Sequence, residues 1–155
     1  MKIPTLGYQD DISISKSEIA LTQLTESIEQ FVSENFICAT TLAGASEDIL
    51  RGLINQKGEK STVEEAADNV MELREKHGLN AMEDAKKKND LYNHWNKARN
   101  SYKHHGKKDE GVFVTNLFDD AYWMIKRALE KAKKLNIAVK NEIDFENWCI
   151  EKIHL

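Results

Sequence analysis

Turn-forming residues are scarce in this sequence of 155 residues, which has one proline, Pro4, and only seven glycines. An all-β chain needs such residues at frequent turns, so their scarcity argues against a sandwich or a barrel. Long helices joined by few turns fit the composition better. Because 41% of the residues are hydrophobic, the chain can bury a sizeable core, and its length fits a single domain over residues 1–155.

Long apolar runs and closely spaced cysteines are also missing. No run approaches the roughly 18 apolar residues needed to span a bilayer, and no N-terminal stretch resembles a signal peptide. The two cysteines, Cys38 and Cys149, lie far apart and in no spacing typical of a metal site. We interpret them as reduced thiols of a cytoplasmic protein, in preference to a disulfide, and we expect no contact with a membrane.

Basic residues are distributed unevenly, although the whole chain carries a net charge of −4. Residues 1–85 contain 7 basic and 16 acidic side chains, whereas residues 86–134 contain 13 basic and 6 acidic side chains. The acidic total argues against general affinity for nucleic acid. The local basic excess can still attract a polyanion near one site. From charge alone, an alternative is equally favoured, in which the basic residues are solvated helix faces without a partner.

Hydrophobic periodicity and capping patterns predict a succession of helices. The pattern of Ser or Asn followed three residues later by Glu, which begins a helix, occurs at Ser15, Ser61 and Asn80. Residues 1–13 show no periodicity and are interpreted as a loose N-terminal arm, and Asp144 is expected to cap a last short helix. The expected helices are 16–33, 36–56, 62–77, 81 to 104 or 105, 115 or 116 to 135, and 144–154. Short loops between them predict an all-α, up-and-down bundle of five or six helices.

The second expected helix has a face of small residues, Ala43, Gly44 and Ala45, which lets a neighbouring helix approach closely. Glu47 borders the apolar stripe of this helix, where an unpaired carboxylate would be costly. Two interpretations remain open. Glu47 is either an exposed residue at the edge of the stripe or a carboxylate that faces a basic group on another helix.

Function is expected in the stretch from Leu91 to His105, which carries three of the five histidines and one of the three tryptophans. Arg99, Asn100 and His104 form an R-N-x-x-x-H string near the end of the predicted helix. Residues four apart share a helix face, so the side chains of Asn100 and His104 can meet. Arg99 lies roughly 140° around the helix from His104, and its long side chain can bend back. The buried stripe of this helix is expected to be Leu91, Trp95, Ala98 and Tyr102.

These residue types suit the cleavage of a phosphodiester without a metal ion. Histidine titrates near neutral pH and can move protons. Arginine can bind phosphate through several donors and stabilise developing negative charge. In RNA the nucleophile can be the 2′-hydroxyl of the substrate, so the protein does not have to supply one. Spacing alone leaves open a plain alternative, in which the string is a polar helix end whose histidine meets the last carbonyl groups.

The string resembles the R-N-x-x-x-H signature of the HEPN superfamily, a group of small α-helical bundles. This chain matches the signature at Arg99, Asn100 and His104, with a helix rich in small residues, TLAGASEDIL, before it and an amphipathic helix after it. The resemblance covers residues 15–135 in helix order, and its specific part is six residues long. It implies a metal-independent endoribonuclease that needs no cofactor and acts as a homodimer, in a toxin–antitoxin or defence system with an antitoxin protein as partner.

The resemblance also implies roles for individual residues. His104 would be the general acid and base, Arg99 would stabilise the scissile phosphate, and Asn100 would orient the site. Some superfamily members carry an acidic residue on an earlier helix, a role for which Glu47 is the candidate, placed to position Arg99. The remaining expected RNA contacts are Lys103, His105 and Lys107.

Other functions remain as alternatives. The N-terminal half also resembles uncharacterised bacterial proteins with an LAGAxExIL helix and a later N-x-x-K-H motif, and in that branch Arg99 would be incidental. A non-catalytic bundle of the same fold would bind a nucleotide, RNA or a partner protein through the same polar cleft. A structural protein would use its apolar helix faces to form oligomers. A metal site is not expected, because His94 and His104 are ten residues apart with no carboxylate or thiol at ligand spacing.

Overall fold

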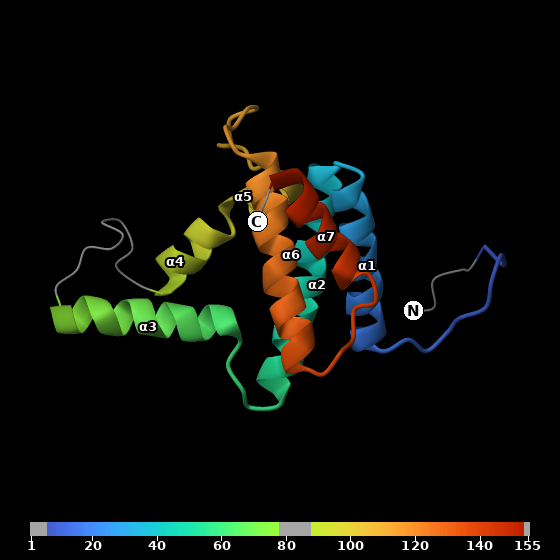
Figure 1. Ribbon diagram of the computed structural model, residues 1–155, viewed down its shortest axis with the longest axis horizontal. Helices are drawn as coiled ribbons and strands as arrows, with labels where there is room; N and C mark the ends of the chain where they lie inside the picture. The colour runs from blue at the N-terminus through green and yellow to red at the C-terminus, as the bar shows by residue number, and fades with distance from the viewer. Residues whose placement is uncertain (1–5, 78–87, 154–155) are drawn as a thin grey trace.

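Two long helices, α1 (Lys16–Val32) and α2 (Phe36–Gln56), form an antiparallel pair in the computed structural model, which describes residues 6–77 and 88–153 (Figure 1). The predicted capping box begins α1, since the Ser15 hydroxyl accepts from the backbone N–H of Glu18 and the Glu18 carboxylate accepts from that of Ser15. The bounds of both helices agree with the sequence prediction within one residue.

Buried hydroxyl groups join the two helices of this pair. Ser27 Oγ donates to the carbonyl oxygen of Ala39 at 2.7 Å, and Ser46 Oγ donates to that of Ala20 at 2.7 Å. Small residues at the interface let the backbones come close enough for these bonds. Because each hydroxyl has an acceptor, its burial carries little cost.

Helices α6 (Leu117–Lys134) and α7 (Glu142–Ile153) pack on this pair and complete the core. Asn116 caps α6, and its side chain accepts from the backbone N–H of Asp119 at 3.1 Å. The core is apolar, and aromatic rings gather around Phe31 at one end of it. Its fully buried large side chains include Leu24, Ile28, Phe31, Leu50, Ile125 and Phe145.

The bundle does not alternate strictly up and down, because α2 and α6 run in the same direction. Glu47, midway along α2, pairs with Arg127 and Lys131 of α6, and Lys134 at the end of α6 donates to the carbonyl oxygen of Lys60 just beyond α2. The three helices between them form an excursion that returns the chain to the starting end of α2 (Figure 1). The expected alternation is therefore wrong at this point.

The excursion consists of α3 (Thr62–His77), α4 (Lys88–Trp95) and α5 (Lys97–Lys103), of which α3 projects away from the bundle (Figure 1). A small apolar cluster joins α3 to α4. Its members are the buried Ala67 and Leu91 with the partly buried Val70, Met71, Tyr92 and Trp95. Residues 78–87 lie outside the described residues, and with them the expected cap at Asn80 and the predicted start of the next helix.

The helix expected to continue to residue 104 or 105 is divided at Asn96 into α4 and α5, which brings the described helices to seven. Arg127 of α6 donates to the backbone carbonyl of Trp95 at 3.2 Å and to the Asn96 side chain at 3.0 Å. When a side chain binds a backbone carbonyl, it disturbs the regular hydrogen bonds of the helix at that point. A side chain inserted in this way bends a helix. Local periodicity could not predict this contact, because the two residues lie 31 positions apart in the sequence.

The last helix begins two residues before the expected cap, so the assignment of Asp144 as its N-cap was wrong. Asn141 holds that position. Its backbone carbonyl accepts from Phe145, and its side chain donates to the carbonyl oxygen of Thr25 on α1 at 2.9 Å. This tertiary contact sets the start of α7.

The described residues contain helices and loops but no strand. Cys38 is exposed and Cys149 is buried, and both are free thiols, as expected. No helix within residues 6–77 and 88–153 combines the length and the apolar character needed to cross a membrane.

Candidate functional site

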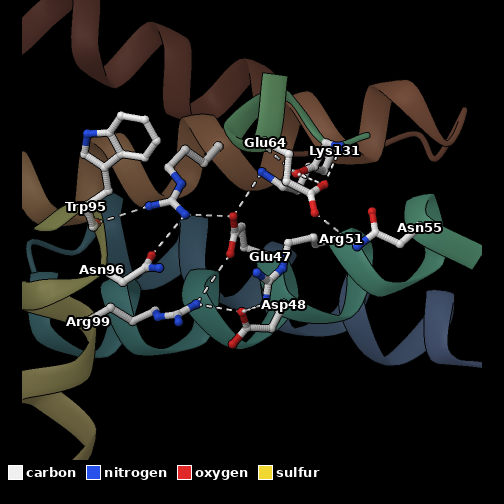
Figure 2. A network of polar contacts seen from close by, with 11 residues as sticks. Glu47, Asp48, Arg51, Asn55, Glu64, Trp95, Asn96, Arg99 and Lys131 are labelled. Carbon is white, nitrogen blue, oxygen red and sulfur yellow. Dashed lines mark hydrogen bonds and ion pairs between the residues drawn. The ribbon is translucent and has the colours of Figure 1, made fainter. Parts of the chain in front are cut away.

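The motif arginine, Arg99, points from α5 across the surface of α2. Its Nη1 lies 2.8 Å from Oδ1 of Asp48 and 3.4 Å from Oε2 of Glu47, and the residue is only 9% exposed (Figure 2). Gly44 makes this path available, because a Cβ at that position would stand 2.8 Å from Cγ of Arg99. The small-residue face of α2 thus receives a side chain from α5.

Glu47 is buried, with 2% of the residue exposed, and contacts three cations. Oε1 lies 2.9 Å from Arg127 and 3.0 Å from Lys131, while Oε2 faces Arg99. Burial acts to raise the pKa of Glu47, but the charges of Arg127 and Lys131 outweigh it and leave that pKa below its usual value. Of the two interpretations of Glu47, the structure shows the carboxylate facing basic groups on other helices.

Lys131 and Arg127 were not predicted as part of this cluster. Lys131 is fully buried, and burial lowers the pKa of its ammonium group although Glu47 opposes the shift. One feature of the sequence could have indicated that Lys131 is buried. It lies three residues after Ala128 and seven after Met124, on the apolar stripe of α6. A lysine on such a stripe requires a buried anion, and Glu47 is that anion.

The cluster carries more positive than negative groups. Four basic side chains are joined through ion pairs to only two carboxylates, those of Glu47 and Asp48. The basic members are Arg51, Arg99, Arg127 and Lys131. The buried Nε atoms of Arg99 and Arg127 also lack a hydrogen-bond partner among the described residues. An anion nearby would be stabilised by this excess.

Tyr102 fastens the motif helix to the start of α6. Its hydroxyl donates to Oδ2 of Asp120 at 2.6 Å, and Thr115 donates to the same oxygen at 2.5 Å. Burial, the hydrogen bond and the charge of Asp120 together raise the pKa of Tyr102 well above its usual value. Tyr102 and Trp95 are half-buried, whereas of the expected stripe only Leu91 is fully buried, and Arg99 on the neighbouring face is buried instead.

The motif histidine, His104, lies beyond the end of α5. Its backbone is extended, with φ −132° and ψ 141°, and only its N–H remains tied to the carbonyl of Asn100 at 3.0 Å. The rule that residues four apart share a face holds only while both are helical. The structure shows no hydrogen bond between the side chains of Asn100 and His104, both of which are exposed, so that expected contact is not formed.

The other expected site residues, Lys103, His105 and Lys107, are exposed around the same end of α5. Within one chain, therefore, the predicted residues fall into two groups. Glu47 and Arg99 meet in the interior against α2, whereas Asn100 and His104 face solvent with the basic residues beyond them.

A cavity of about 570 Å³ adjoins the buried group. Helices α2 to α6 all contribute to its lining, which combines the indoles of Trp95 and Trp123 with Arg99 and Arg127, two of the three arginines of the cluster. Its lining contains the basic side chains Arg99, Lys126 and Arg127, the imidazole of His94, and the acidic side chains Asp119, Asp120 and Glu130. The volume lies within the range of small-molecule sites.

No group of three or more His, Cys, Asp or Glu side chains in the described residues is arranged to hold a metal ion. The comparisons with known proteins found no family model, no curated protein and no solved structure that matches this chain.

Proposed function

We propose that this protein is a HEPN-like endoribonuclease that cleaves RNA without a metal ion and acts as a homodimer, as a toxin or defence component with an antitoxin as partner. The observation that supports it best is the placement of Arg99. The arginine of the R-N-x-x-x-H string is 9% exposed and is held between Glu47 and Asp48 of α2. An arginine fixed by carboxylates is pre-organised for a charged transition state, because it does not have to reorient during the reaction.

The proposed reaction uses the 2′-hydroxyl of the RNA. His104 removes the proton of this hydroxyl as its oxygen attacks the adjacent phosphorus, and the bond from phosphorus to the 5′-oxygen of the next nucleotide breaks. The protonated imidazole of His104 then gives its proton to the leaving oxygen, and the products are a 2′,3′-cyclic phosphate and a 5′-hydroxyl end. Arg99 stabilises the negative charge that develops on the phosphate, and Lys103, His105 and Lys107 bind the flanking backbone.

Two copies of the chain are part of the proposal because one copy separates the groups. Arg99 faces α2, whereas His104 is turned to solvent beyond α5. An exposed apolar segment, Val112 to Val114, follows the motif, and Phe113 contacts the ring of Tyr102 at 5.5 Å between centroids. Burying this segment against a second copy would bring the histidine ends of two chains together.

Cleavage of single-stranded RNA in the presence of EDTA tests the proposal. The wild-type chain is expected to leave 2′,3′-cyclic phosphate ends, and His104→Ala is expected to lower the rate by about 10²- to 10⁴-fold, the usual contribution of a general acid and base. Lys140→Ala, an exposed lysine in the loop before α7, serves as a control that keeps full activity. Intact RNA with the wild-type chain, or equal activity in His104→Ala, would refute the assignment.

One observation favours a second candidate, a non-catalytic bundle that binds RNA or a partner protein. Nη1 of Arg99 already donates to two carboxylates, so part of its capacity to bind phosphate is used within the protein. In this case His104→Ala and Lys103→Ala each weaken RNA binding. The wild-type chain then cleaves no RNA at any concentration.

A further inference from the structure

The cavity beside the motif has an unusual aromatic wall. Trp123 of α6 is 62% exposed and lines the cavity together with the half-buried Trp95 of α4. A large exposed indole at the mouth of a cavity is an available surface on which a flat ring can stack. The third tryptophan, Trp148, packs instead in the aromatic part of the main core. Two of the three indoles are therefore placed where a ligand can reach them.

Positive charge lies at the buried side of this cavity. Arg99 and Arg127 both line it, and they belong to the cluster whose four basic side chains are joined to only two carboxylates. Lys126 also lines the cavity and forms no ion pair with a described residue. Arg99, Lys126 and Arg127 can together attract an anionic group on the ligand.

Carboxylates also line the cavity. Asp119 and Glu130 are exposed, and neither side chain forms an ion pair with a described residue. A carboxylate oxygen can accept a hydrogen bond from an amino group on the edge of a base. An anion alone would be repelled by these groups, so the ligand should carry a hydrogen-bond donor apart from its negative charge.

From these features we propose that the cavity binds one nucleotide unit, with an amino-bearing base stacked on Trp123 and its phosphate toward the cationic side. A nucleotide combines the three required parts, which are a flat ring, an amino donor and an anion, and the cavity volume of about 570 Å³ suits a ligand of this size. This site would bind part of the RNA on which the protein is proposed to act. Only the choice of a nucleotide as ligand rests on that proposed function. It does not require cleavage by His104, which does not line the cavity.

Binding of AMP, CMP, UMP and inorganic phosphate to the full chain tests this site, measured by calorimetry and by NMR of the three indole N–H groups. AMP and CMP are expected to bind more tightly than UMP, which lacks the amino group, and phosphate is expected to bind most weakly. The indole signals of Trp95 and Trp123 should shift, whereas that of Trp148 should not. Binding of AMP no tighter than that of phosphate would overturn the proposal, as would signals that do not move.

Substitutions locate the ligand. Trp123→Ala is expected to weaken AMP binding roughly tenfold or more, since stacking on an aromatic ring is a main part of single-nucleotide binding. Ile150→Ala, which shortens an exposed apolar side chain on α7, is the matched control and should bind as the wild type does. Equal affinity in Trp123→Ala would exclude the site.

Two further measurements distinguish an RNA chain from a free nucleotide as the ligand, and a failure of this proposal from a failure of the proposed function. A short single-stranded RNA that binds more tightly than AMP, with the same dependence on Trp123, identifies the unit as part of an RNA chain, whereas tighter binding of AMP identifies a free nucleotide. His104→Ala should retain AMP binding. Loss of cleavage with binding retained contradicts neither proposal, absence of cleavage in the wild type refutes only the ribonuclease, and absence of nucleotide binding refutes only this site.

Discussion

Nη2 of Arg127 lies 2.9 Å from Oε1 of Glu47, and this ion pair joins α6 to α2 in the interior of the protein. The same guanidinium donates to the carbonyl of Trp95, where α4 ends. Glu47 in turn faces Arg99, the first residue of the motif. One buried carboxylate thus links the helix that carries the motif to the main bundle.

The first prediction concerns this carboxylate. Glu47→Gln removes the negative charge that balances three cations, so it should lower the free energy of unfolding by about 3–5 kcal/mol. Urea denaturation measures the change. Glu29→Gln, at an exposed position of α1, is the control and should stay within about 0.5 kcal/mol of the wild type. Equal stability of the two variants would show that Glu47 does not hold the cluster.

A second prediction compares two glycines of the same helix. Alanine is the better helix former by about 1 kcal/mol, and Gly52→Ala should stabilise the protein by about that amount because a Cβ there meets nothing within 4 Å. Gly44→Ala should instead destabilise by about 1–3 kcal/mol, because its Cβ would collide with the methylene groups of Arg99.

A double variant tests the cause of the Gly44 effect. If the collision with Arg99 is responsible, Gly44→Ala should cost much less in a chain that already carries Arg99→Ala, so the two effects should not add. Additive effects in chemical denaturation would place the cause elsewhere.

Alkaline pH should weaken the contact between Tyr102 and Asp120. The pKa of Tyr102 is raised in the folded protein, so its contribution to stability is complete below the unfolded pKa of about 10 and falls as the pH rises above it. Tyr102→Phe should cost about 0.5–1.5 kcal/mol near pH 8, and the difference from the wild type should shrink near pH 11. The exposed Tyr8→Phe should show no difference at either pH. A gap that is constant with pH would contradict the shift.

Local sequence signals predicted most of the helix bounds. Ser15 and Ser61 are side-chain caps that act within three residues, and the first three helices begin within a residue of the prediction. The break at Asn96 and the early start of α7 were missed for one reason. In both, a side chain or a backbone group is bound by a residue far along the chain, Arg127 in the first and Thr25 in the second.

The candidate site was predictable in part. The position of Glu47 beside an apolar stripe and the small residues around Gly44 indicated that a basic group could approach α2, and Arg99 does so. Local spacing could not show that α5 ends at Lys103, which turns His104 away from the face of Asn100. The cavity, with Trp123 on its wall, requires five helices to be packed before it exists, so local periodicity could not predict it.

The last prediction concerns the second copy of the chain. Val114 is 99% exposed in the apolar segment that follows the motif, and a surface of this kind is costly unless it is covered. If the segment lies in the dimer interface, Val114→Asp should convert the dimer to a monomer in light scattering and abolish RNA cleavage. Its effect on the free energy of unfolding of the monomer should stay within about 0.5 kcal/mol, because the side chain packs on nothing within its own chain.

Ile150→Asp places the same charge on an exposed apolar position of α7 and should keep both the dimer and the activity. A wild-type chain that is monomeric at all concentrations would refute the homodimer. A dimer that survives Val114→Asp while cleavage is lost would instead place this segment at the RNA, and a loss of activity in both variants would point to a general effect of added negative charge on RNA binding.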